Sequence, residues 1–295
     1  MAQQKVELRK VRDFSDNLND TFHFIKQNYK PLLLYVFGIS GLFMLVAAIL
    51  SGIYQGESLS NFEEIFKGKK SGKSFELFSG LYMVFILFLW LTSVALQVVV
   101  VSYLKVYEEK DKETPTFEEV WNVFRKHFLP ITFYQIPILI LILIGSVLCL
   151  APGIYLGVVL AVFSSIIIIE DESFSGAFNR CFTLIKENFW SSLGVYFVIF
   201  MISYFGSGIV ALVVGIITGV ISYLTTEDVK STIAIVTSIL NVLSFVFYIL
   251  VFVSITINYY NLTERYDGVG ILRRLDGLGV DKPVVNPHSN LEEEY

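Results

Sequence analysis

The chain has little charge, little cysteine and little histidine. Only 17% of its 295 residues are charged, against about a quarter in average soluble domains. Its two cysteines, Cys149 and Cys181, cannot build a disulfide framework, and we expect both to behave as small apolar residues. The three histidines stand at no metal-ligand spacing from cysteine or carboxylate, so we expect no metal site and no cofactor.

Charged residues are also missing from the interior of several long apolar runs. The chain is 54% hydrophobic, and its charges are gathered in short blocks. Between the blocks lie six runs of roughly 20 residues or more, long enough to cross a hydrocarbon core of about 30 Å as helices. The runs are 31–54, 78–107, 130–149, 152–169, 190–223 and 231–262. The sequence therefore predicts an all-α polytopic membrane protein with six transmembrane helices.

These runs contain no Asp, Glu, Lys or Arg except near their ends, where Lys105 lies. This weighs against a proton-coupled transporter, because ionisable residues within the membrane usually mark proton relays. No pair of embedded carboxylates and no Ser/His/Asp or Cys/His arrangement is visible. We therefore expect no enzymatic activity and no nucleic-acid partner.

Lysine and arginine are distributed unevenly between the two sides that six spans define. One side, which includes both termini, holds 17 of them, and the other holds 5. The side richer in Lys and Arg faces the cytoplasm by the positive-inside rule. We expect a multi-pass protein of the plasma membrane with both termini in the cytoplasm and loop 55–76 outside.

One segment of the chain occurs twice. Residues 14–29 read FSDNLNDTFHFIKQNY, and residues 174–189 read FSGAFNRCFTLIKENF. A shorter copy keeps Phe117, Trp121, Asn122, Phe124 and Phe128. Each copy precedes an apolar run, which indicates a repeated unit made of an amphipathic helix and a membrane hairpin. We expect one domain over 1–266 with units at about 13–107, 116–169 and 173–263, and a partly disordered cytoplasmic tail over 267–295.

The two long copies share a Lys-x-Asn pattern where each helix meets the membrane. Lys26 and Asn28 correspond to Lys186 and Asn188. A basic side chain there can reach lipid phosphates, a contribution of about 1 kcal/mol, so these four residues are candidates for contact with lipid headgroups. The structural alternative is that lysine snorkels and asparagine ends the helix.

Two further groups of residues are candidates for holding the helices together. Glu170 and Arg180 flank the turn after the fourth run, where they either pair and fix this elbow or simply face water. Polar and small residues within the runs serve hydrogen bonding and close packing between helices, or line a cavity, or contact a second copy. These residues are Gln97, Gln135, Asn241, Gly153, Gly157, Gly208, Gly215 and Gly219.

The stretch 151–190 carries a recognisable pattern: Pro152, Ile154 and Tyr155 open it, Glu170 ends the apolar run, and Arg180, Leu184 and Trp190 follow. It resembles the six-helix integral membrane domain fused to some bacterial glycerophosphodiester phosphodiesterases, and their stand-alone relatives. The segment 259–265, YYNLTER, also resembles the ending of such proteins. Cys181 stands where that family has serine. No segment of this sequence could build the soluble phosphodiesterase domain, so the resemblance implies a bacterial membrane domain and not the enzymatic activity.

These observations favour a non-enzymatic protein of the bacterial inner membrane that binds lipids, or holds a partner, at the cytoplasmic leaflet. The expected partners are membrane lipids, and another membrane protein or a second copy is a further possibility. The alternative function is a transporter or permease-like subunit with a path between the hairpins.

Overall fold

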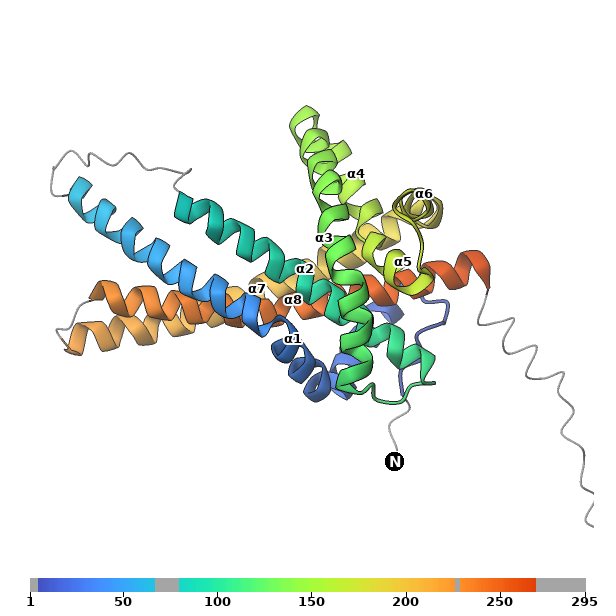
Figure 1. The fold of residues 1–295 in the computed structure, drawn as a ribbon, viewed down its shortest axis with the longest axis horizontal. Coiled ribbons are helices and arrows are strands. Elements are labelled where there is room, and N and C mark those ends of the chain that lie inside the picture. The colour runs from blue at the N-terminus through green and yellow to red at the C-terminus, as the bar shows by residue number, and fades with distance from the viewer. Residues whose placement is uncertain (1–4, 67–79, 226–228, 269–295) are drawn as a thin grey trace, which may run out of the picture.

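The computed structural model describes residues 5–66, 80–225 and 229–268, and within these ranges the regular structure is helical (Figure 1). The partly disordered tail expected over 267–295 lies almost wholly outside the described residues. The helices are α1 (Phe14–Phe66), α2 (Gly80–Glu109), α3 (Phe117–Leu148), α4 (Leu150–Leu160), α5 (Phe163–Glu170), α6 (Phe174–Ile185), α7 (Phe189–Thr225) and α8 (Val229–Asp267).

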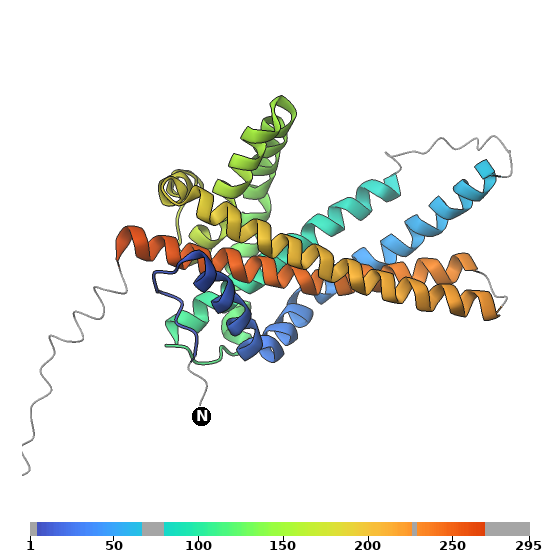
Figure 2. The same cartoon turned by 180° about the vertical axis from the view of Figure 1, so that it is seen from behind.

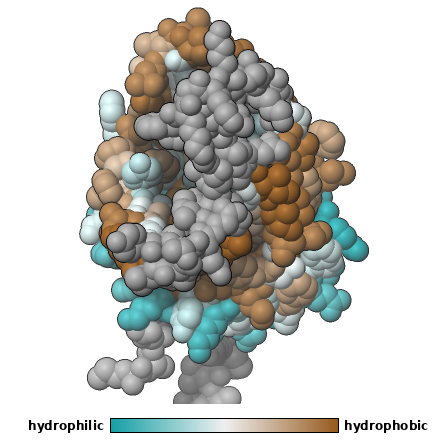
Figure 3. Space-filling view, turned by 90° about the vertical axis from the view of Figure 1, so that its left-hand side faces the viewer, coloured by the Kyte–Doolittle hydropathy of each residue, from teal (hydrophilic) through white to brown (hydrophobic). Residues whose placement is uncertain are grey.

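Six segments of the described chain are long and apolar enough to cross a membrane, which confirms the predicted polytopic fold class. They are Phe14–Tyr54, Gly80–Glu109, Phe117–Leu148, Leu150–Glu170, Phe189–Val220 and Ser238–Asp267. Large apolar side chains project outward from them: Val147 is 86% exposed and Leu148 is 79% exposed. Figure 3 shows apolar residues over much of one face and hydrophilic residues toward its lower edge. A surface this apolar suits lipid rather than water.

The segments form three hairpins, α1–α2, α3–α4 and α7–α8, which diverge from one end of the molecule (Figures 1 and 2). We call this end the base. Residues 5–13, α5, α6 and the C-terminal end of α8 gather there. Across hairpins, the most extensive packing is between α1 and α8.

Two of the three repeated segments are not separate helices, contrary to the expectation of an amphipathic helix before each membrane hairpin. Residues 14–29 continue into the span as α1, and residues 117–128 continue as α3, with Pro31, Pro130 and Pro137 inside the helices. A proline removes one backbone donor and bends a helix without necessarily ending it. Figure 2 shows α1 changing direction near the base. The third copy is separate, because a turn over 186–188 divides α6 from α7.

Helix ends at the base follow from local sequence. Thr116 and Glu119 form a capping box: Thr116 N donates to Glu119 Oε2 at 2.7 Å, and Glu119 N donates to Thr116 Oγ1 at 3.4 Å. Ser173 caps α6 by accepting from Gly176 N at 3.3 Å. Asp171 ends α5 in the left-handed conformation, with φ of 54°. These caps satisfy backbone groups that the helices leave open.

The glycines predicted to pack helices behave differently from one another. A Cβ on Gly153 would lie 2.1 Å from Ser146 Oγ, so α3 and α4 approach closely there. A Cβ on Gly157, Gly208, Gly215 or Gly219 would meet no described atom within 4 Å. For those four glycines the prediction of close packing is wrong within the described chain, because regular spacing of small residues does not say which helix lies opposite.

Candidate functional sites at the base

Residues 5–13, here called the strap, form a non-helical segment at the base. Val6 is 7% exposed and Leu8 is fully buried. Val6 N donates to Gln27 Oε1 on α1 at 3.2 Å, and Tyr107 on α2 donates its hydroxyl to Val6 O at 3.3 Å. Two apolar anchors and two hydrogen bonds therefore fix the start of the strap against the first hairpin.

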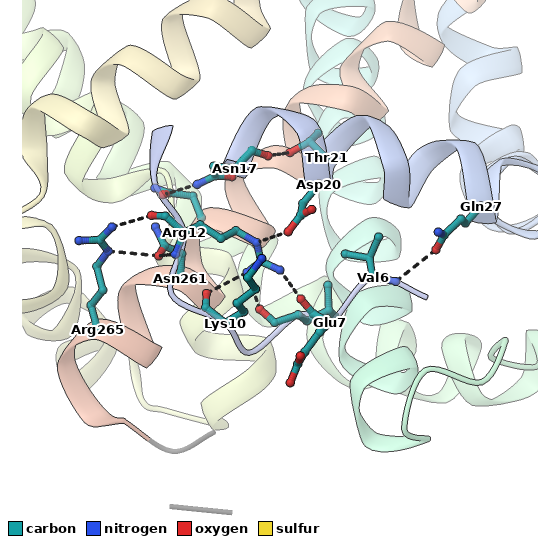
Figure 4. A network of polar contacts seen from close by, with 12 residues as sticks. Val6, Glu7, Lys10, Arg12, Asn17, Asp20, Thr21, Gln27, Asn261 and Arg265 are labelled. Carbon is teal, nitrogen blue, oxygen red and sulfur yellow. Dashed lines mark hydrogen bonds and ion pairs between the residues drawn. The ribbon is translucent and has the colours of Figure 1, made fainter. Parts of the chain in front are cut away.

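Arg12 is the centre of the strap, and its side chain has no exposed surface. Its Nε donates to Asp20 Oδ2 at 2.7 Å, and the strap curls so that its own carbonyls face the guanidinium (Figure 4). One terminal nitrogen donates to Leu8 O at 2.7 Å and to Lys10 O at 3.1 Å, and the other donates to Glu7 O. A buried guanidinium needs partners for its donors, and this loop supplies them.

The strap is also bonded to the last helix (Figure 4). Arg12 N donates to Asn261 Oδ1 at 2.7 Å, and Arg265 donates back to Arg12 O at 2.6 Å. The N-terminal and C-terminal parts of the described chain are thereby joined at the base.

A second buried network lies between α1, α7 and α8. Asn17 Nδ2 donates to Asn258 Oδ1 at 2.8 Å, and Asn258 Nδ2 donates to Ser192 Oγ at 3.0 Å and to Tyr196 Oη at 2.9 Å. Interhelical hydrogen bonds of this kind hold membrane helices together. This network was not predicted from the sequence, where its only signal is an asparagine inside the sixth apolar run, Asn258.

The structure brings Glu170 and Arg180 together at the elbow, with Glu170 Oε2 at 3.4 Å from Arg180 Nε. It also adds partners from α8. Tyr259 donates its hydroxyl to Glu170 Oε1 at 2.8 Å, and Arg180 donates to Asp267. The elbow is therefore a contact between α5, α6 and the end of the last span, rather than an isolated pair.

Asp171, directly after Glu170, is surrounded by basic side chains from two other helices, α2 and α3. Lys126 Nζ lies 2.7 Å and His127 Nε2 lies 2.9 Å from Asp171 Oδ1, and Lys105 Nζ lies 3.9 Å from Oδ2. The hydrogen bonds from Lys126 and His127 lower the pKa of Asp171 to about 2. Lys105 also donates to Ile168 O at 2.7 Å. A positive side chain at the C-terminal end of α5 interacts favourably with the helix dipole.

The four residues predicted to touch lipid headgroups do not share one environment. Lys26 and Lys186 are exposed, and Asn188 is half-buried. Asn28 is only 5% exposed, and its side chain donates to Phe24 O at 3.0 Å and accepts from the Tyr103 hydroxyl at 2.9 Å. The prediction is wrong for Asn28, because both polar atoms of its amide are used inside the protein.

The polar residues predicted inside the spans include one clear helix–helix contact. Gln135 on α3 donates to Gln97 on α2, and it lies 3.4 Å from Ser164 Oγ on α5. This arrangement is hydrogen bonding between helices rather than the lining of a cavity. Asn241 lies in α8, and its side chain is outside the described residues.

An apolar groove of about 740 Å³ separates α1 from α8 farther from the base. It begins at Phe37 and Ser238, each 20 residues along its helix from the bonded pair Asn17 and Asn258. Its lining residues are Phe37, Gly41, Met44, Leu45, Ala48, Ile49, Gly52, Ile53, Ile235, Ser238 and Ile239. The two helices are thus bonded near the base, and both line the groove farther along.

In the described ranges no three His, Cys, Asp or Glu side chains gather where they could hold a metal ion. Cys149 is exposed, whereas Cys181 is buried on α6, where burial raises the pKa of its thiol to about 12. No protein family, curated protein or solved structure matches this chain. The resemblance to phosphodiesterase-linked membrane domains therefore stays a prediction.

Proposed function

We propose that this chain is a non-enzymatic protein of a bacterial inner membrane that binds anionic lipids of the cytoplasmic leaflet. One observation carries the proposal: exposed Lys26 and Lys186 occupy equivalent positions of the repeated segment, each four residues after a phenylalanine. Phe22, one turn before Lys26, is 41% exposed. Phe182, one turn before Lys186, is half-buried, and Trp190 at the start of α7 is 80% exposed.

A comparison with the other basic residues at the base supports this assignment, because several of those residues already hold helices together. Arg12, Arg180 and Lys126 are each hydrogen-bonded to carboxylates. Lys26 and Lys186 have no such partner among the residues with described side chains. Aromatic rings favour the membrane interface, and a basic group close to an anionic leaflet contributes about 1 kcal/mol.

The shape of α6 agrees with a helix lying on the membrane surface. Its buried face consists of Ala177, Cys181, Leu184 and Ile185. Its exposed polar positions are Ser175, Asn179, Thr183 and Lys186. Phe174, Phe178 and Phe182 are half-buried between these two faces, where they would enter the lipid.

The proposal is tested by Lys26→Gln with Lys186→Gln in the full chain, with bound phosphatidylglycerol measured by native mass spectrometry. Losing about 1 kcal/mol at each of these two contacts predicts lipid binding about fivefold weaker at each. The matched control is Lys5→Gln with Lys10→Gln, which removes the same charge from exposed positions on the strap. Unchanged lipid occupancy in the Lys26/Lys186 variant would contradict the proposal.

The groove between α1 and α8 favours a second candidate, a permease-like protein with a path for apolar compounds between hairpins. Gly41→Leu tests it, because a Cβ on Gly41 meets no described atom within 4 Å and the side chain is free to fill the groove. Uptake or efflux of an apolar dye by vesicles containing the protein should fall in this variant, while phosphatidylglycerol occupancy stays unchanged. Equal dye flux with and without the protein would exclude the second candidate.

A further inference from the structure

We infer that Trp121 and Arg125 on α3 form a third contact for the phosphate of an anionic phospholipid, equivalent to those around Lys26 and Lys186. The inference rests on the proposed function and extends it to the second hairpin. Each hairpin would then carry one aromatic–basic pair at its entry into the cytoplasmic leaflet.

The equivalence follows from the register of the repeat. Pro31 and Pro130 lie 99 residues apart, inside α1 and α3. The same offset places Phe22 on Trp121 and Lys26 on Arg125. An offset of 160 places that pair on Phe182 and Lys186. All three copies therefore carry an aromatic residue and, four positions later, a basic one, so the two lie on the same helix face.

Hydrogen bonds support this register independently of the aromatic–basic pairs. The offset of 99 also places Asn28 on His127, and both are 5% exposed. Asn28 Nδ2 donates to Phe24 O at 3.0 Å, and His127 Nδ1 lies 2.9 Å from Val123 O, in each case the carbonyl four residues earlier. Two different side chains thus make the same local bond at the same repeat position.

The second bond of each of these side chains is also equivalent. Asn28 Oδ1 accepts from Tyr103 on α2, and His127 Nε2 lies 2.9 Å from Asp171 at the end of α5. In both cases the polar side chain ties the entering helix of its hairpin to the returning segment. This fixed inward position sets which side of the helix faces outward.

The outward side of α3 matches that of α1. Trp121 is 38% exposed, close to the 41% of Phe22, and Arg125 is exposed like Lys26. Neighbouring Lys126 is bonded to Asp171, whereas Arg125 has no hydrogen bond or ion pair with the residues that the structure describes. A guanidinium donates two parallel hydrogen bonds to phosphate, which makes it a better phosphate ligand than the lysines of the other two units.

The test is Arg125→Gln in the full chain, with phosphatidylglycerol binding followed by native mass spectrometry and the melting temperature measured in parallel. Loss of about 1 kcal/mol predicts binding about fivefold weaker at an unchanged melting temperature. Arg125→Lys should restore part of the binding, because it keeps the charge but not the paired hydrogen bonds. Lys10→Gln is the control for an exposed charge outside the repeat.

Three outcomes would overturn the inference, and they are distinguishable from one another. If Arg125→Gln binds lipid normally while Lys26→Gln with Lys186→Gln does not, the third contact is wrong and the proposed function stands. If neither variant loses lipid, both are wrong. If excess inorganic phosphate displaces the lipid from wild type and Arg125→Gln abolishes that competition, the residue belongs to a site for free phosphate instead of a lipid headgroup.

Discussion

Replacing Arg12 by methionine tests whether the strap contributes to the stability of the base. The change keeps a long side chain but removes a guanidinium that has no exposed surface. Its loss leaves the Asp20 carboxylate and the carbonyls of Glu7, Leu8 and Lys10 without their donor. Removing one partner of a buried ion pair costs about 3–5 kcal/mol.

The lower end of that range applies here, because Asp20 is 22% exposed and water can replace part of the lost interaction. We therefore expect Arg12→Met to lower the free energy of unfolding by about 3 kcal/mol. Arg12→Lys should cost less but not recover wild-type stability, since one compact ammonium cannot reach all the acceptors of a planar guanidinium.

The measurement is reversible unfolding in mixed micelles of mild detergent and dodecyl sulfate, followed by circular dichroism. Arg125→Met is the matched control, because Arg125 is exposed and its replacement should change the free energy of unfolding by no more than about 0.5 kcal/mol. If Arg12→Met is as stable as this control, the buried network around the strap does not stabilise the fold and the reasoning is refuted.

Three other predictions concern orientation, the elbow and acid stability. With Cys149 changed to serine, a membrane-impermeant thiol reagent added outside should label Ser71→Cys and miss Asp276→Cys; the reverse pattern would invert the topology. Glu170→Gln and Arg180→Gln should each lower the melting temperature, and the double variant should be no worse than either, whereas additive effects would argue against coupling. The pKa of Asp171 is lowered to about 2 from about 3.9 unfolded. Its contribution to stability is therefore complete above about pH 4 and lost as the pH falls toward 2, so Asp171→Asn should weaken the pH dependence of the unfolding free energy in that window.

Features that depend on neighbouring residues could be predicted from the sequence. The six spans follow from runs of apolar residues, because the length and composition of a run are enough to specify a membrane helix. The capping box at Thr116 and Glu119 is equally local. Glu170 and Arg180 lie ten residues apart on either side of one turn, so their proximity needed no knowledge of the distant chain.

Features that depend on which distant residues meet could not be predicted in the same way. Arg12 finds partners in strap carbonyls, which have no sequence signature, and in Asn261, 249 residues away. The sequence places Asn28 beside Lys26, where the helix meets the membrane. Only the position of Tyr103 on α2 shows that the Asn28 side chain is buried inside the protein. The spacing of Gly208, Gly215 and Gly219 describes one helix face but not what lies opposite.

The bond between the strap and the last helix has a consequence for biosynthesis. Arg12 leaves the ribosome 249 residues before Asn261, its partner in the finished protein. At about 5–20 residues per second, that interval lasts on the order of 12–50 s. During this time the strap can reach its contacts on the first hairpin, but its bonds to Asn261 and Arg265 cannot form. The first described segment to be synthesised therefore completes its contacts only when the final span is in place.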